Sequence, residues 1–126
     1  MPYHVSQPEF AQLVEQALAE LPPPFANALD EVAVEICQVP SERDLKALGL
    51  GVRRLLLGLY RGRPLTTRSV EETGRLPDVV YIYKANLEQV CDTADELVRE
   101  VRKTVLHELG HHFGMSEKDL SELGYG

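Results

Sequence analysis

Two stretches of this chain carry apolar residues at helical spacing. In the first, residues three and four apart form one side of a helix, and they are Phe10, Leu13, Val14, Ala17, Leu18 and Leu21. Ser6 and Glu9 stand in front of this stretch with the spacing of a capping box, and Pro22 to Pro24 follow it. Because proline cannot continue a helix, the pattern predicts an amphipathic helix between Ser6 and Pro22.

The second helical stretch is longer and runs from about Asp92 to Phe113. Its apolar stripe consists of Val98, Val101, Val105, Leu109 and Phe113, with Leu106 at its edge. We expect Asp92 or Asp95 to cap its start, since a side-chain oxygen there can accept an N–H group of the first turn. We expect Gly114 to end the helix, because glycine readily adopts the left-handed conformation found after helix C-termini.

Three stretches between these helices have the patterns of strands. Residues 30–39 alternate with period two, residues 55–60 are an apolar run, and residues 79–83 (Val-Val-Tyr-Ile-Tyr) carry the strongest β preference. Shorter helical segments are expected at 25–29, 41–48, 87–91 (capped by Asn86) and 116–124, with a turn at 61–64 and a loop to residue 75. This order predicts an α+β fold, with about three strands packed on the long C-terminal helix.

The long helix contains the most informative motif of the chain, His107-Glu108-Leu109-Gly110-His111, which has the form H-E-x-x-H. Residues four apart lie on one side of a helix, so both imidazoles can point at one metal ion. Glu108 lies about 100° round the helix from His107, where it can reach water at the ion without being a first-choice ligand. The motif is typical of zinc-dependent peptide-bond hydrolysis, and two surface histidines on an amphipathic helix are the alternative interpretation.

A catalytic zinc site takes three protein ligands, so a third must come from outside the motif. If Gly114 turns the chain back under the metal, an acid three residues later can complete the set, and Glu117 stands there. Asp119 and Glu122 are close competitors. Acidic residues are also favoured at the start of a helix for electrostatic reasons alone, so the sequence leaves the third ligand open.

A zinc ion (Zn2+) held in this way would lower the pKa of its water to roughly 7. Glu108 would then act as the general base, taking the proton of the attacking water and delivering it to the leaving amine. His112 falls in the apolar sector of the helix, where we expect a packed core residue or a residue that supports the ligands. Glu100 lies near His107 on the wheel; it is either an acceptor for an imidazole N–H or a solvated glutamate.

Composition narrows the class of protein. The chain has 126 residues, 44% hydrophobic residues and a net charge of −7, which indicates one soluble domain over residues 1–126 and argues against nucleic acid or an anionic membrane as partner. The first residues contain no apolar signal segment, and no stretch approaches 18 apolar residues. Cys37 and Cys91 belong to no metal-binding spacing and are expected to be free thiols. We therefore expect a cytoplasmic protein.

The segments HELGHHFGMSEKDL (107–120) and LPDVVYIYKANLE (76–88) resemble the small zincin-like metallopeptidases, or minimal zincins. The resemblance covers most of the chain. It implies a short mixed sheet with a few helices, zinc ligands His107 and His111, general base Glu108, and an acidic third ligand at the position of Glu117. In this family that position is the last of H-E-x-x-H-x-x-G-x-x-D, so the chain has glutamate where the pattern has aspartate, and the extra methylene lengthens the reach.

The leading hypothesis is a zinc metallopeptidase that acts on peptides or small proteins. The chain is too short to build a second lobe around a cleft, so the substrate is expected to add as a strand to a sheet edge, which we place at Val79 to Tyr83. One alternative is a non-catalytic zincin-like module that binds metal or a partner. The other is a metal-dependent hydrolase that cleaves a non-peptide amide. The sequence does not indicate the oligomeric state.

Overall fold

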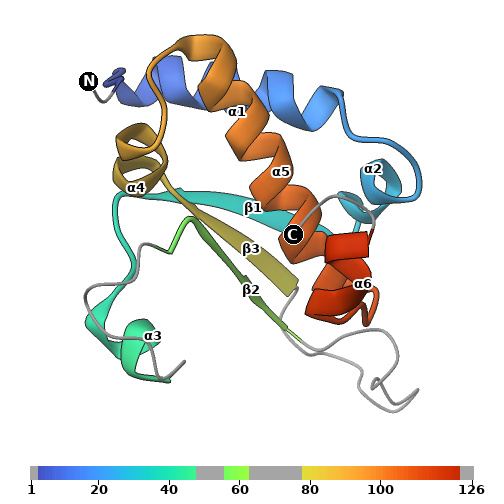
Figure 1. Cartoon of the computed structure of the whole chain (residues 1–126). Coiled ribbons are helices and arrows are strands. Elements are labelled where there is room, and N and C mark those ends of the chain that lie inside the picture. The colour runs from blue at the N-terminus through green and yellow to red at the C-terminus, as the bar shows by residue number, and fades with distance from the viewer. Residues whose placement is uncertain (1–2, 48–55, 63–77, 123–126) are drawn as a thin grey trace.

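The computed structural model describes residues 3–47, 56–62 and 78–122. Along these residues the elements are α1 (Gln7–Ala19), α2 (Phe25–Ala28), β1 (Val32–Cys37), α3 (Glu42–Ala47), β2 (Gly58–Arg61), β3 (Asp78–Tyr83), α4 (Lys84–Gln89), α5 (Ala94–His112) and α6 (Glu117–Glu122). The predicted α+β fold is confirmed (Figure 1). The predicted loop to residue 75 and the end of the predicted last helix lie outside the described residues.

The three strands form one mixed sheet in the order β1-β3-β2. β1 pairs with β3 in parallel, with Val34 opposite Val80, and β2 pairs with β3 in antiparallel, with Tyr60 also opposite Val80. Because β3 has a neighbour on each side, the expectation that Val79 to Tyr83 offers an open edge is wrong. Among the described strands the outer ones are β1 and β2.

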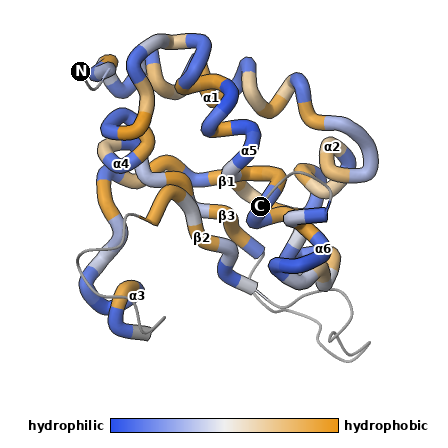
Figure 2. The backbone as a smooth tube through the Cα atoms, in the orientation of Figure 1, coloured by the Kyte–Doolittle hydropathy of each residue, from blue (hydrophilic) through white to orange (hydrophobic). Residues whose placement is uncertain are grey.

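Helix α5 lies between the sheet and α1 (Figure 1). Apolar and polar positions alternate along α1 and α5, as expected of helices with one buried side (Figure 2). Their buried side chains join those of β1, β3 and α4 in one hydrophobic core, whose members include Phe10, Val14, Val80, Ile82, Leu87, Val101, Val105 and Leu109. The sheet and α1 therefore hold α5 from opposite sides.

The capping of α1 agrees with the sequence, whereas the starts of α5 and α4 differ from it. Ser6 caps α1 by accepting the N–H of Glu9 at 3.3 Å, as predicted. Helix α5, however, is capped by Thr93, whose hydroxyl accepts the N–H of Glu96 at 3.1 Å, and not by Asp92 or Asp95. Threonine, like aspartate, can accept from the third residue of the helix, and only Thr93 occupies the preceding position.

The second difference concerns α4, which begins at Lys84, directly after β3. Asn86 therefore lies inside this helix and does not cap it. Its side chain is buried and donates to the carbonyl of Leu56 at 2.7 Å, which ties α4 to the segment entering β2.

Glu88 of α4 joins the N-terminal segment to the core. Its carboxylate accepts from the N–H of Val5 at 2.8 Å and from Lys84 Nζ at 3.0 Å, and the side chains of Glu88 and Lys84 are 4% and 8% exposed. Burial on its own raises the pKa of Glu88, but the hydrogen bonds from Val5, Lys84 and His4 outweigh it, so the pKa is lower than usual.

Both cysteines are free, as expected, and Cys91 is fully buried. Burial raises the pKa of the Cys91 thiol to about 11. Within the described residues, none of the helices has the length and apolar character needed to cross a membrane.

Candidate metal centre

The C-terminal end of α5 is shaped by Gly114. Its φ is 80°, the left-handed conformation expected of it, and the N–H of Met115 returns to the carbonyl of Gly110 at 2.9 Å. The chain then reverses into α6, whose Leu120 packs directly on Gly110. This reversal brings the start of α6 back to the side of α5 that carries the histidines.

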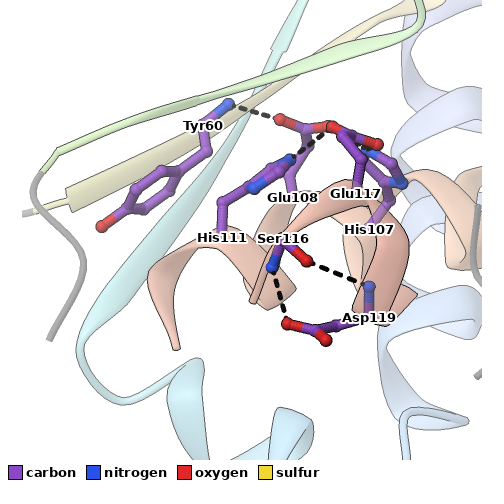
Figure 3. Close-up of polar contacts among 7 residues, drawn as sticks. All are labelled: Tyr60, His107, Glu108, His111, Ser116, Glu117 and Asp119. Atoms are coloured by element: carbon purple, nitrogen blue, oxygen red, sulfur yellow. Dashed lines mark hydrogen bonds and ion pairs between the residues drawn. The ribbon is translucent and has the colours of Figure 1, made fainter. Parts of the chain in front are cut away.

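His107 and His111 converge on that side (Figure 3). Their ring centroids are 5.1 Å apart, and their side chains are 22% and 30% exposed. Both Nε2 atoms face the carboxylate of Glu117. Nε2 of His107 lies 3.2 Å from each of its oxygens, and Nε2 of His111 lies 3.1 Å from Oε1. Two imidazole nitrogens and one carboxylate thus meet at a point that solvent can reach.

Of the three acids considered for this position, the structure brings Glu117 to the histidines. Asp119 instead accepts the N–H of Ser116 at 3.0 Å, while its own N–H donates to the Ser116 hydroxyl at 3.1 Å. This reciprocal pair caps α6, and Figure 3 shows it on the other side of the helix start. Its hydrogen bonds with Ser116 lower the pKa of Asp119. Glu122 is exposed near the opposite end of α6.

Glu108 lies beside the histidines but is held by the sheet. Its Oε1 accepts the backbone N–H of Tyr60 in β2 at 2.9 Å, and its Oε2 is 3.8 Å from His107 Nε2. Its side chain is 13% exposed, and burial raises its pKa above the ordinary value, against the opposing effects of the Tyr60 N–H and the two histidines. A largely buried carboxyl with a raised pKa is suited to accept a proton from water.

The two glutamates differ in their distances to the imidazoles. Ligand atoms of His107, Glu108 and His111 all lie within 4.8 Å of one another, so Glu108 is also near enough to bind an ion. The Glu117 carboxylate, however, is closer to both imidazoles, and among the described residues it accepts no hydrogen bond from a backbone N–H. Glu117 is therefore the better placed of the two to share an ion with the histidines, and Glu108 is held beside them by the sheet.

A pocket of about 250 Å³ opens beside His107 and Glu108 between β2 and α5. It is lined by Leu56, Leu57, Gly58, Glu100, Lys103 and Thr104 as well. α5 approaches β2 this closely because residue 58 is glycine, since a Cβ there would overlap the methyl group of Thr104. Glu100, considered above as an acceptor for an imidazole, lies in the wall of this pocket.

His112 is buried, as its place in the apolar sector predicted, but its surroundings are polar. Nδ1 is 2.9 Å from Asp78 Oδ2, and Nε2 is 3.4 Å from Glu31 Oε2. The hydroxyl of Tyr60 donates to the same oxygen of Asp78 at 2.7 Å. Sequence reasoning did not find Asp78 or Tyr60; an acid at the first residue of a strongly apolar strand was the one available signal.

The side chains fit the metal that the motif implies. Two neutral imidazoles and one carboxylate form a donor set that zinc favours in hydrolytic sites, and here His107, His111 and Glu117 present these atoms to one another. The family model for zincin-like metallopeptidases matches residues 29–126.

The chain belongs to the zincin-like metallopeptidase family. Membership in this zincin-like family implies a metal ion, typically zinc. A solved structure of a conserved hypothetical protein from Thermo thermophilus is similar over 96% of this chain and 100% of that chain, with 26% identity and a TM-score of 0.55. Among curated proteins none matches this chain.

Proposed function

We propose that this protein is a zinc-dependent peptidase in which His107, His111 and Glu117 hold the ion and Glu108 is the general base. The observation that carries the proposal is the convergence of two imidazoles and one carboxylate beside a second, buried carboxylate. Zinc in this position would supply a Lewis acid that polarises a carbonyl and lowers the pKa of water.

The protein's own residues account for the proton transfers. Glu108, with its raised pKa, accepts the proton of the attacking water and returns it to the leaving amine. The N–H of Tyr60 keeps one carboxylate oxygen, Oε1, in a set position and leaves Oε2 turned toward His107. The base is thus oriented by the backbone of the sheet before any substrate binds.

The substrate would bind along the outer edge of β2, which none of the described strands pairs with, in place of the edge first expected at Val79 to Tyr83. The N–H of Tyr83 donates to the carbonyl of Leu57 at 3.0 Å, so in the antiparallel ladder the backbone groups of every second residue face β3. Those of Gly58 and Tyr60 face the other way, which the bond from Tyr60 to Glu108 bears out. Because Glu108 already holds the Tyr60 N–H, a peptide strand added there would bond to Gly58 and to the carbonyl of Tyr60. It would pass Glu108 with one side chain in the adjoining pocket.

The edge of β2 and the adjoining pocket favour peptides or small proteins as substrates over nucleic acid or a membrane. We expect the protein to encounter these substrates in the cytoplasm. The wall of the pocket combines the apolar residues Leu56 and Leu57 with the charged residues Glu100 and Lys103. Its volume of about 250 Å³ accommodates one side chain of medium size. We therefore expect cleavage next to such a residue.

The test combines zinc analysis with a peptide-library cleavage assay. Glu117→Ala should lose zinc affinity, while Glu122→Ala, in the same helix, is the matched control. Glu108→Gln should keep the zinc and lower turnover at least about 100-fold, the contribution of a general base. Zinc binding without cleavage of any peptide would favour the non-catalytic module, and cleavage of small amides alone would favour the non-peptide hydrolase. Failure of the wild type to bind zinc more tightly than His107→Ala/His111→Ala would refute the metal site.

A further inference from the structure

Tyr60 makes two hydrogen bonds in opposite directions. Its backbone N–H donates to Glu108 Oε1 at 2.9 Å, and its side-chain hydroxyl donates to Asp78 Oδ2 at 2.7 Å. The hydroxyl also lies 3.3 Å from Nδ1 of His112. One residue of β2 therefore connects the candidate base to a buried polar pair at the C-terminal end of α5, and Figure 3 shows the Tyr60 ring directed away from Glu108.

Asp78 is the centre of this arrangement. Its side chain is 1% exposed, and a single oxygen, Oδ2, is in hydrogen-bond contact with both the Tyr60 hydroxyl and the His112 ring. A carboxylate buried this deeply is stable only with such partners. Asp78 is the first residue of β3, Tyr60 belongs to β2, and His112 follows the candidate ligand His111 in α5. One carboxylate thus joins β3 to β2 and α5, which carry Tyr60 and the candidate base.

β2 needs such an anchor. It has four residues, begins with a glycine, and pairs with β3 along one side. Gly62, the residue after β2, also lies directly against Asp78, because a Cβ at Gly62 would overlap the Asp78 carboxylate. A small shift of β2 would move the Tyr60 N–H away from Glu108, and the carboxylate of the base would then be free to change rotamer.

We propose that Tyr60 is a positioning residue, and that Asp78 and His112, by holding its hydroxyl, keep its N–H on the Glu108 carboxylate. The role as positioner of a base rests on the proposed function. The hydrogen-bonded arrangement itself does not, and it can be measured without any substrate. Asp78 and His112 act through Tyr60 and do not touch the reacting atoms.

The test is amide hydrogen exchange at residue 60, followed by NMR in the metal-free and the zinc-loaded protein. Tyr60→Phe removes the hydroxyl and keeps the ring. Tyr81→Phe is the matched control, since Tyr81 is the neighbouring tyrosine on β3 and its ring packs under Arg61, away from the site. We expect exchange at residue 60 to become about tenfold faster in Tyr60→Phe and to stay unchanged in Tyr81→Phe. Glu108→Ala should speed the same amide by a similar factor.

Zinc affinity and kinetics separate this role from a general loss of structure. Tyr60→Phe should bind zinc within about threefold of wild type and, in the cleavage assay, lower kcat while leaving KM unchanged. Unchanged protection of residue 60 would overturn the proposal. An equal acceleration at the amides of Leu59 and Tyr83 would also overturn it, because the whole sheet would then have loosened. If the wild type cleaves no peptide, the peptidase function fails, and the exchange result still decides whether the hydroxyl places this N–H.

Discussion

Because Gly110 contacts Leu120, we expect Gly110→Ala to destabilise the protein, whereas the same change inside a helix is usually stabilising. Alanine in place of glycine inside a helix normally stabilises by about 1 kcal/mol. Gly110 is buried in α5, and a Cβ there would lie 3.2 Å from both Cγ and Cδ1 of Leu120 and closer still to Cδ2. Leu120 is itself fully buried, so it can make room only if α6 moves.

The cost of overpacking Leu120 is larger than the gain in helix propensity. Overpacking a buried contact by one methyl group costs about 1–3 kcal/mol, which exceeds the gain in helix propensity. We expect Gly110→Ala to lower the free energy of unfolding by about 1 kcal/mol. Because α6 carries Glu117, its displacement should also weaken zinc binding about tenfold, as for other residues that support metal ligands.

A double-mutant cycle isolates the contact. Leu120→Ala alone should cost about 2–5 kcal/mol, but it removes the atoms that Gly110→Ala would strike. In the Leu120→Ala background Gly110→Ala should therefore stabilise by up to about 1 kcal/mol, a change of about 2 kcal/mol from its effect in the wild type. Urea unfolding followed by circular dichroism measures all four proteins. Equal stabilisation in both backgrounds would refute the reasoning, because the methyl group would then meet no obstruction.

Glu88, Thr93 and Cys91 give three further predictions. Because the folded-state pKa of Glu88 is lowered, the stabilisation by its carboxylate is complete above the ordinary pKa of 4.5 and is lost as pH falls through the folded-state pKa. Glu88→Gln should therefore lower the free energy of unfolding by about 3 kcal/mol at pH 7. It should also make the free energy of unfolding, measured with urea, less dependent on pH between pH 5 and pH 3. Thr93→Ala should cost about 1 kcal/mol in thermal unfolding, and an equal loss in Asp95→Ala would contradict the assignment of the cap. The buried Cys91 thiol, whose pKa is raised to about 11, should not react with Ellman's reagent at pH 8 until the protein unfolds, and rapid reaction in the native state would show that it is accessible.

The parts of the site that the sequence predicted are those determined by local geometry. His107 and His111 are one helical turn apart, so their convergence follows from the helix alone. Glu117 reaches them because Gly114 reverses the chain a few residues earlier, which is also a local event. The cap of α5 was missed because Asp92, Thr93 and Asp95 are all competent acceptors within four residues, and only the backbone distinguishes them.

The parts that the sequence did not predict depend on which strands are neighbours. Val79 to Tyr83 has the composition of a buried strand, but the composition does not say whether that strand is central or at an edge. The bond from the Tyr60 N–H to Glu108 requires β2 to be an outer strand with α5 beside it. The pairing of Asp78 with His112 likewise joins residues from a strand and a helix that only the folded chain brings together.

The strand order also has a consequence for how the chain acquires its fold during synthesis. β1 and β2 leave the ribosome first, yet each pairs with β3 and neither pairs with the other. Neither strand can therefore form its native pairing until β3 has been translated. The β1–β3 pairing also closes a long loop, which slows folding. The nascent protein should remain open to proteases and chaperones throughout this interval, and become resistant in one step once β3 and α5 have emerged.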